Sequence, residues 1–257
     1  MSSVQYIEKQ GEKPTVERKQ LRYERKYLLN SDAATVLKQR VSYLMQPDKN
    51  GESGEYHTSS LYFDDLYNSS FYDKQNGVLQ RDKFRARFYN NSLDLIHLEQ
   101  KFKHGEAIWK ETATITKNQY EMMCKGDYTF MRELSAPVFR QFYTKNATRR
   151  MRGVIQIDYK RLAYTHPSGN VRLTFDSDLT ASTARASSTT TASSTTTTSP
   201  ATARNSFSIM PRNEVILEIK YDRFLPSFIH ELLTGVPFTQ QLSISKFELG
   251  RLALVGR

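Results

Sequence analysis

Several segments of this chain alternate charged and apolar residues with a period of two, which is the period of a β-strand. In KFRARFY, which begins at Lys83, the basic residues Lys83, Arg85 and Arg87 share one face and the apolar residues share the other. Five further segments show the same parity: Arg22, Glu24 and Lys26; Glu99, Lys101 and Lys103; Tyr159 and Arg161; Arg172, Thr174 and Asp176; Glu218 and Lys220. The fold must therefore stabilise a charged face that runs across six strands.

One such strand would ordinarily be explained by a solvated sheet face. Six together weaken that explanation, because the shared faces are dominated by Arg and Lys, and like charges opposite each other destabilise a sheet. The formal net charge of +10 predicts an anionic partner: nucleic acid, an acidic membrane surface or a phosphorylated small molecule. If the sheet curls into a closed barrel with these faces inward, its interior becomes a cationic tunnel and its apolar outer face can be covered by helices.

The remaining pattern predicts an α+β fold in which helices decorate a mainly antiparallel sheet. We predict eight strands: Arg22–Leu29, Thr58–Asp64, Lys83–Tyr89, Asp94–Lys103, Ala107–Ile115, Val154–Tyr164, Asn170–Asp176 and Glu214–Tyr221. We predict six helices: Ser31–Met45 with Ser31 as N-cap, Asn68–Gln75, Lys117–Lys125, Phe130–Thr144, Pro226–Thr234 and Lys246–Leu254.

The chain is interpreted as one domain, residues 21–257, preceded by a flexible polar arm, residues 1–20. Residues 182–200 are almost wholly Ser, Thr and Ala, and we expect a disordered surface loop there. A glycosylated stalk is disfavoured because no signal peptide precedes it. The sequence contains no transmembrane segment and only one cysteine, Cys124, so we expect a cytoplasmic protein.

The charged strands and their neighbours carry motifs in a specific order. These are RYERKYLL around Glu24 and Lys26, SLYFDD at Ser60–Asp65, KFRARFY, LEQKFK at Leu98–Lys103, WKE at Trp109–Glu111, DYKRLAY at Asp158–Tyr164, VRLTFD at Val171–Asp176, VILEIKY at Val215–Tyr221 and SISKFELG at Ser243–Gly250. From about residue 21 to the C-terminus the chain resembles the VTC domain of the triphosphate tunnel metalloenzyme (CYTH-like) superfamily. The resemblance implies an eight-stranded antiparallel β-tunnel with helices packed outside.

The resemblance also implies the roles of individual residues. The residues expected to act in catalysis are Arg85, Arg87, Lys101, Arg161 and Lys246. The residues expected to bind substrate are Lys26, Arg22, Lys103, Lys110, Tyr159, Arg172 and Ser245. Glu218, and in addition Glu24 and Glu99, are expected to hold Mn²⁺ or Mg²⁺. Lys103 stands where eukaryotic members have a histidine, so that contact is altered but still cationic. Glu24 and Glu99 have a second interpretation as ion-pair partners of neighbouring Arg and Lys.

The implied activity is a polyphosphate polymerase that transfers the γ-phosphate of ATP to a phosphate or polyphosphate acceptor, so that a polyphosphate chain grows. The expected partners are ATP and polyphosphate or pyrophosphate. A triphosphate or polyphosphate hydrolase of the same fold is an alternative, although SLYFDD and the lysine of SISKF favour the VTC domain. A non-catalytic polyanion-binding protein is another. RNA is disfavoured because the basic residues alternate along strands and no aromatic RNP pair is present. Whether the protein has a membrane-protein partner is left open by the sequence.

Overall fold

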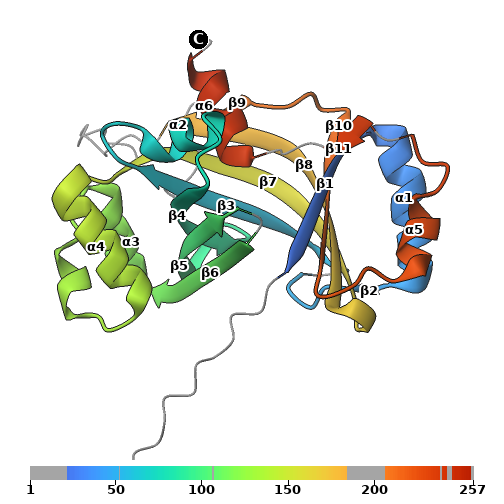
Figure 1. Cartoon of the computed structure of the whole chain (residues 1–257), viewed down its shortest axis with the longest axis horizontal. Helices are drawn as coiled ribbons and strands as arrows, with labels where there is room; N and C mark the ends of the chain where they lie inside the picture. The colour runs from blue at the N-terminus through green and yellow to red at the C-terminus, as the bar shows by residue number, and fades with distance from the viewer. Residues whose placement is uncertain are drawn as a thin grey trace, which may run out of the picture.

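The computed structural model describes residues 22–51, 53–105, 107–183, 206–237, 239–241 and 245–255 (Figure 1). The predicted N-terminal arm and residues 184–200 of the predicted loop lie outside the described residues. At the boundary of that loop the prediction was wrong by two residues, because Ser182 and Thr183 continue a strand and pair with Gln156 and Ile155. The Ser182 side chain is buried there, which its small size permits.

The described strands form one sheet in which every pair is antiparallel. Its order is β11 (Thr239–Gln241), β1 (Tyr23–Asn30), β10 (Glu214–Tyr221), β8 (Val171–Thr183), β7 (Arg152–His166), β3 (Glu55–Asp64), β4 (Gln80–Tyr89), β5 (Ser92–His104) and β6 (Ala107–Ile115). The short strands β2 (Gln46–Pro47) and β9 (Phe207–Ser208) pair with β7 and β8. All eight predicted strands are present, and the predicted α+β class is confirmed.

The sheet is strongly curved, but it does not close as a complete hydrogen-bonded barrel. Among the described residues, the ladder ends at β6 on one side and at β11 on the other. Side chains bridge this opening, since Lys101 Nζ on β5 lies 3.0 Å from Glu24 Oε2 on β1. The expected closed barrel is therefore corrected to an open sheet whose two sides are joined across the interior by an ion pair.

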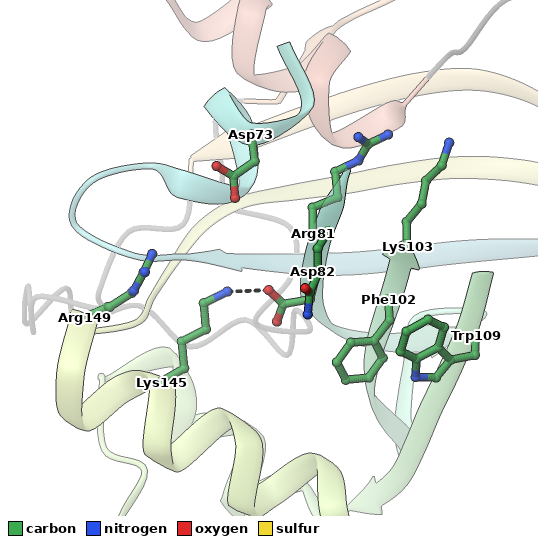
Figure 2. A pocket seen from close by; sticks show the side chains of 9 residues that line it. Asp73, Arg81, Asp82, Phe102, Lys103, Trp109, Lys145 and Arg149 are labelled. Atoms are coloured by element: carbon green, nitrogen blue, oxygen red, sulfur yellow. Dashed lines mark hydrogen bonds and ion pairs between the residues drawn. The ribbon is translucent and has the colours of Figure 1, made fainter. Parts of the chain in front are cut away.

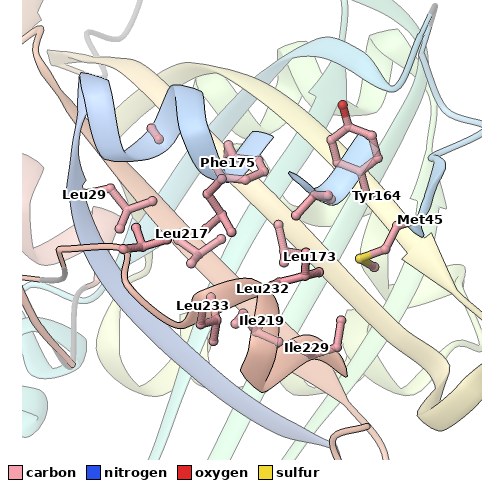
Figure 3. Close-up of a cluster of buried hydrophobic side chains, with 14 of the residues drawn as sticks. Leu29, Met45, Tyr164, Leu173, Phe175, Leu217, Ile219, Ile229, Leu232 and Leu233 are labelled. Atoms are coloured by element: carbon pink, nitrogen blue, oxygen red, sulfur yellow. The ribbon is translucent and has the colours of Figure 1, made fainter. Parts of the chain in front are cut away.

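Two helical layers cover the apolar outer face of the sheet (Figure 1). α1 (Ser31–Leu44) and α5 (Ser227–Leu233) pack on the cluster drawn in Figure 3, which includes Leu173, Leu217 and Ile219. α3 (Lys117–Cys124), η1 (Thr129–Glu133) and α4 (Pro137–Arg149) pack on a second cluster. None of the helices in the described ranges combines the length and apolar character needed to cross a bilayer.

Two helix predictions need correction. The predicted helix Phe130–Thr144 is the short 3₁₀ helix η1 followed by α4, because Ala136 is held extended before Pro137, which occupies the first turn of α4. The N-cap of α1 is Asn30 and not Ser31, since the Asn30 side chain accepts a hydrogen bond from the Ala33 amide at 2.8 Å. Both errors concern helix ends, which leave the sheet pattern unchanged.

One end of the sheet interior is filled by α6 (Lys246–Val255), beside α2 (Ser69–Gln75). Phe247 packs there against Tyr62, Ile155 and Ile157. Ile155 and Ile157 have the parity of Tyr159 and Arg161, so the inward face is apolar at this end and charged farther along. Gly250 permits the close approach, because a Cβ there would lie 2.7 Å from Ile155 Cδ1.

Candidate functional site

The concave face of the sheet encloses a cavity of about 820 Å³, which we call the tunnel. Its lining contains fourteen basic residues and three glutamates, contributed by strands from both sides of the sheet and by α2 and α6. All fifteen residues predicted to form the site line this cavity. The shared parity of the charged strands therefore places the strand members of this set on one inward face, as expected, whereas Ser245 and Lys246 come from the start of α6.

Several lining residues were not in the predicted set. Lys83 and Lys220 could have been predicted to line the tunnel, because each shares the parity of the predicted residues on its strand. Lys74 could not have been predicted from strand parity, because it comes from α2 and reaches the tunnel only through tertiary packing. The SLYFDD motif explains how α2 is held: Asp64 accepts hydrogen bonds from the Ser70 amide at 2.9 Å and the Phe71 amide at 3.3 Å.

The centre of β4 presents two guanidinium groups with different surroundings. Arg85 Nε donates to Glu99 Oε2 at 2.6 Å. Arg87 is 8% exposed and donates to the hydroxyls of Ser60 at 3.1 Å and Tyr159 at 3.2 Å. No carboxylate among the described residues pairs with Arg87. Glu99 on the neighbouring strand attracts Arg87 without forming an ion pair with it, so the buried charge is only partly compensated and a bound anion would stabilise it further.

Asp176 is a fully buried carboxylate that the sequence did not single out as a site residue. Arg161 binds it through two hydrogen bonds of 2.6 and 2.7 Å, and Lys246 Nζ lies 2.7 Å from the same carboxylate. Burial alone would raise the pKa of Asp176, but Arg161 and Lys246 overcome burial and lower it to about 2. Asp176 thus orients two predicted catalytic cations and ties the start of α6 to β8.

The three glutamates of the tunnel are each paired with cations. Glu24 binds Lys26 at 2.7 Å as well as Lys101. Glu99 uses one oxygen for Arg85 and the other for Lys110, at 2.7 Å. Glu218 lies 3.0 Å from Lys220 Nζ. Glu24 and Glu99 thus form the ion pairs of their second interpretation, and their role as metal ligands stays a prediction.

A divalent ion would fit best beside Glu218 and Glu24. Burial and the charge of Glu218 both act to raise the pKa of Glu24, although Lys26 and Lys101 lower it overall, so the two carboxylates lie close enough to repel. A shared cation would relieve this repulsion, and Mg²⁺ or Mn²⁺ is commonly held by one or two carboxylates together with phosphate oxygens. No group of three metal-ligating side chains occurs in the described part of the chain. Glu99 fits less well: burial would raise its pKa, but Arg85, Arg87 and Lys110 surround it and lower the pKa, so no carboxylate repulsion calls for a metal ion there.

Two further predicted residues lie at the rim opposite α6. Arg172 donates to the Tyr56 hydroxyl at 2.7 Å and forms an ion pair with Asp48. Arg22 Nε lies 3.0 Å from Asp222 Oδ1, and Arg22 Nη2 donates to the Asn170 carbonyl at 2.9 Å. These contacts hold both guanidinium groups at the entrance, where they remain partly exposed.

The protonation of Lys83 should make the stability of the protein depend on pH. Burial lowers its pKa to about 7, and the charges of Lys74 and Arg81 add to this effect. The unfolded chain, whose lysine pKa is about 10.4, therefore binds more protons than the folded chain between about pH 7 and about pH 10, so stability rises with pH in that window. We expect Lys83→Met to flatten this rise, which has a limiting slope of about 1.4 kcal/mol per pH unit for one proton.

Urea unfolding at fixed ionic strength across this pH range measures the effect. Lys160→Met is the matched control, since Lys160 is an exposed strand lysine paired with Asp178 outside the tunnel. If the free energy of unfolding of Lys83→Met rises with pH as steeply as that of the wild-type protein, the lowered pKa assigned to Lys83 is contradicted.

Comparison with known proteins agrees with this architecture. A family model described as VTC domain matches residues 21–255. No curated protein sequence matches the chain. Among solved structures, HpAC1 from Hippeastrum, a candidate adenylyl cyclase with a dominant triphosphatase activity, is similar with a TM-score of 0.52 and 14% identity, over 90% of this chain and 96% of that one. A candidate adenylate cyclase from Bacillus halodurans has a TM-score of 0.48 and 14% identity, over 89% and 96%. The family match and the similarity to HpAC1 confirm the predicted fold class.

Proposed function

Because this chain belongs to the VTC domain family, we propose that it is a metal-dependent phosphotransferase that extends a polyphosphate chain with the γ-phosphate of ATP. The family and the fold support a function in triphosphate or polyphosphate chemistry. The transfer step and the choice of ATP as donor are our proposal. The expected site residues all line one cavity, which supports the proposal.

The observation that carries the proposal is the excess of buried positive charge in the tunnel. Arg87 donates to two neutral hydroxyls and forms no ion pair with a described carboxylate, although burying an incompletely compensated charge is costly. A phosphate oxygen is the natural partner, because a guanidinium can donate two parallel hydrogen bonds to it. A fold that keeps such a residue buried is built to receive an anion with several negative charges.

In the proposed reaction, a terminal oxygen of the acceptor attacks the γ-phosphorus of ATP. A new P–O bond forms, the bond to the β,γ-bridging oxygen breaks, and ADP leaves. No covalent enzyme intermediate is needed, because phosphoryl transfer can be catalysed by positioning and charge stabilisation. Arg85 and Arg87 would hold the transferred group, while Arg161, Lys246 and Lys101 would orient the flanking phosphates.

When bound, a divalent ion would neutralise charge on the phosphates and help to align them. Glu218 and Glu24 are the residues that would hold it. The lysines beside these glutamates would then bind both the carboxylates and the phosphates. Lys26 and Lys220, which lie near these glutamates, would balance the charge as substrate enters.

The product distribution distinguishes the proposed reaction from hydrolysis, the second candidate, which the triphosphatase activity of HpAC1 favours. The purified chain is incubated with ATP and Mn²⁺, and the products are separated on a urea gel stained for polyphosphate. We expect a ladder of lengthening chains together with ADP. Orthophosphate without a ladder would replace the proposal with hydrolysis, and binding without any turnover would replace it with a polyanion-binding role.

A further inference from the structure

Lys83 on β4 lines the tunnel without the ion pair that most lysines there form. Lys83 has no ion pair with a carboxylate in the described part of the chain, and its Nζ lies 4.8 Å from the centre of the Phe247 ring. An aromatic face attracts a cation less strongly than a carboxylate does, so the charged form of Lys83 is poorly stabilised. The tunnel lysines that do pair with a carboxylate are Lys26, Lys74, Lys101, Lys110, Lys220 and Lys246.

The strand pattern explains why Lys83 lacks a carboxylate partner. The adjacent residue Asp82 points to the opposite face of β4, where it borders a second cavity of about 370 Å³ and turns towards Lys145 of α4 (Figure 2). Lys145 Nζ lies 2.6 Å from Asp82, and the Gln100 side-chain amide donates to the same carboxylate at 2.8 Å. Asp64 attracts Lys83 from a neighbouring strand, but backbone amides of α2 engage the Asp64 carboxylate.

The charges around Lys83 are mostly positive. Lys74 from α2, Arg81 from β4 and Lys101 from β5 all repel its ammonium form. Burial, together with this repulsion, lowers the pKa of Lys83 to about 7, so about half of the molecules carry the neutral amine at neutral pH. A neutral amine is a nucleophile, whereas an ammonium group is not. Lys83 is therefore a reactive side chain inside a cavity that small molecules can enter.

The same cations would bind an anionic reagent beside this amine. Arg81 has the strand parity of Lys83, and it donates to the Val78 carbonyl at 2.7 Å. A guanidinium group has several N–H donors, so it can hold a phosphate group as well. The tunnel, of about 820 Å³, has room for a small phosphorylated molecule. Lys83 thus combines a nucleophilic nitrogen with a place for a phosphate leaving group.

We propose that Lys83 is a covalent modification site, at which small acyl phosphates acylate the tunnel. The neutral Nζ attacks the carbonyl carbon of the acyl phosphate, a C–N bond forms, and the C–O bond to phosphate breaks. Phosphate leaves with the electron pair of that bond and takes up the proton that the nitrogen loses. The products are an N-acyl-lysine and inorganic phosphate. This inference goes beyond the proposed function, since it needs only a tunnel that admits a phosphorylated anion.

Acylation of Lys83 would change the tunnel itself. An amide in place of the amine removes one positive charge and ends the repulsion with Lys74 and Arg81. It also places a bulkier, uncharged group against Phe247. Ion pairs disfavour the same reaction at the paired lysines of the tunnel, because a carboxylate stabilises the ammonium form, which does not react. The modification is therefore expected mainly at Lys83.

The test labels the full chain at about pH 8 with acetyl phosphate or with the neutral ester p-nitrophenyl acetate, and mass spectrometry follows each lysine. Lys160 is the internal control, because it is exposed on β7 and its hydrogen bond and ion pair with Asp178 raise its pKa. We expect acetyl phosphate to acetylate Lys83 at least about tenfold faster than Lys160, since Lys83 is mostly neutral at this pH. The preference for Lys83 should be about tenfold larger with acetyl phosphate than with the ester, because a charge-assisted contact to phosphate is added.

Arg81→Gln isolates the contribution of phosphate binding. We expect this variant to lose most of the extra preference for Lys83 that acetyl phosphate shows over the ester. A change in the pKa of Lys83 alters its reaction with both reagents alike, so it cancels in this comparison. Arg212→Gln is the matched control, because Arg212 is exposed and does not line the tunnel, and it should behave as the wild-type protein does.

Acetylation of Lys83 that is no faster than that of Lys160 would overturn the proposal. An equal preference for Lys83 with both reagents would also overturn it, because Lys83 would then be a reactive amine without a neighbouring phosphate site. The same conclusion would follow if Arg81→Gln kept the full extra preference, since Arg81 is the cation expected to hold the phosphate.

Discussion

Replacing Arg87 with alanine is expected to weaken triphosphate binding by about tenfold to about a hundredfold and to remove most turnover. The reason is that Arg87 is a buried cation without a described carboxylate partner. A hydrogen bond to a charged group is worth about 1.5–3 kcal/mol, and each 1.4 kcal/mol corresponds to about tenfold in affinity. Calorimetry with tripolyphosphate and a turnover assay with ATP and Mn²⁺ measure both effects.

The structure also predicts that Arg87→Ala and Arg85→Ala will differ in stability. Loss of Arg87 leaves two hydroxyls, Ser60 and Tyr159, without a donor, which is a small loss. Loss of Arg85 removes one of the two cations bound to the buried carboxylate of Glu99, so the free energy of unfolding should fall by up to about 3 kcal/mol. Arg87→Lys keeps the charge but loses the planar fork, and we expect intermediate affinity. Wild-type binding and turnover in Arg87→Ala would remove the central arginines from the proposed site.

Replacing Glu218 with glutamine is expected to abolish turnover while triphosphate binding is largely kept. Glu218 is buried among cations: Lys220 Nζ lies 3.0 Å from its carboxylate and Arg161 Nη2 lies 3.6 Å from it. Burial alone would raise the pKa of Glu218, but Lys220 and Lys26 overcome it and hold the pKa well below its usual value. The carboxylate is therefore charged at neutral pH and available to a divalent ion. Glutamine keeps the shape but lacks the charge that a hard cation needs.

Binding and turnover must be measured separately across a Mn²⁺ titration. If Glu218 is a metal ligand, Glu218→Gln binds tripolyphosphate by calorimetry and lacks turnover at any Mn²⁺ concentration. Glu214→Gln is the matched control, because Glu214 is on the same strand but does not line the tunnel. If Glu218 serves only as an ion-pair partner, the variant melts at a lower temperature and keeps metal-dependent turnover, which would remove it from the metal site.

The strand pattern was predictable because its signal is local. Alternation of charged and apolar residues assigns the two faces of a strand without knowledge of its neighbours, so Lys83, Arg85 and Arg87 could be placed together from sequence. Helix ends were less predictable, as Ala136 and Pro137 show, because capping depends on a few backbone angles. The apolar residues Ile155 and Ile157 on the inward face were missed, since parity indicates a face but not what fills it.

The sequence by itself determined the α+β class, the eight long strands and the charged face shared by six of them, because each follows from short-range periodicity. Lys110 and Lys246 were expected only from the resemblance to the VTC domain. Only the tertiary structure decided that Asp176 joins Arg161 to Lys246, that α2 brings Lys74 to the tunnel, and that Lys101 and Glu24 bridge an open sheet. These contacts join residues far apart in the chain. Their formation depends on strand register, sheet curvature and helix docking, which are set by the packing of the whole domain and leave no periodic trace in the sequence.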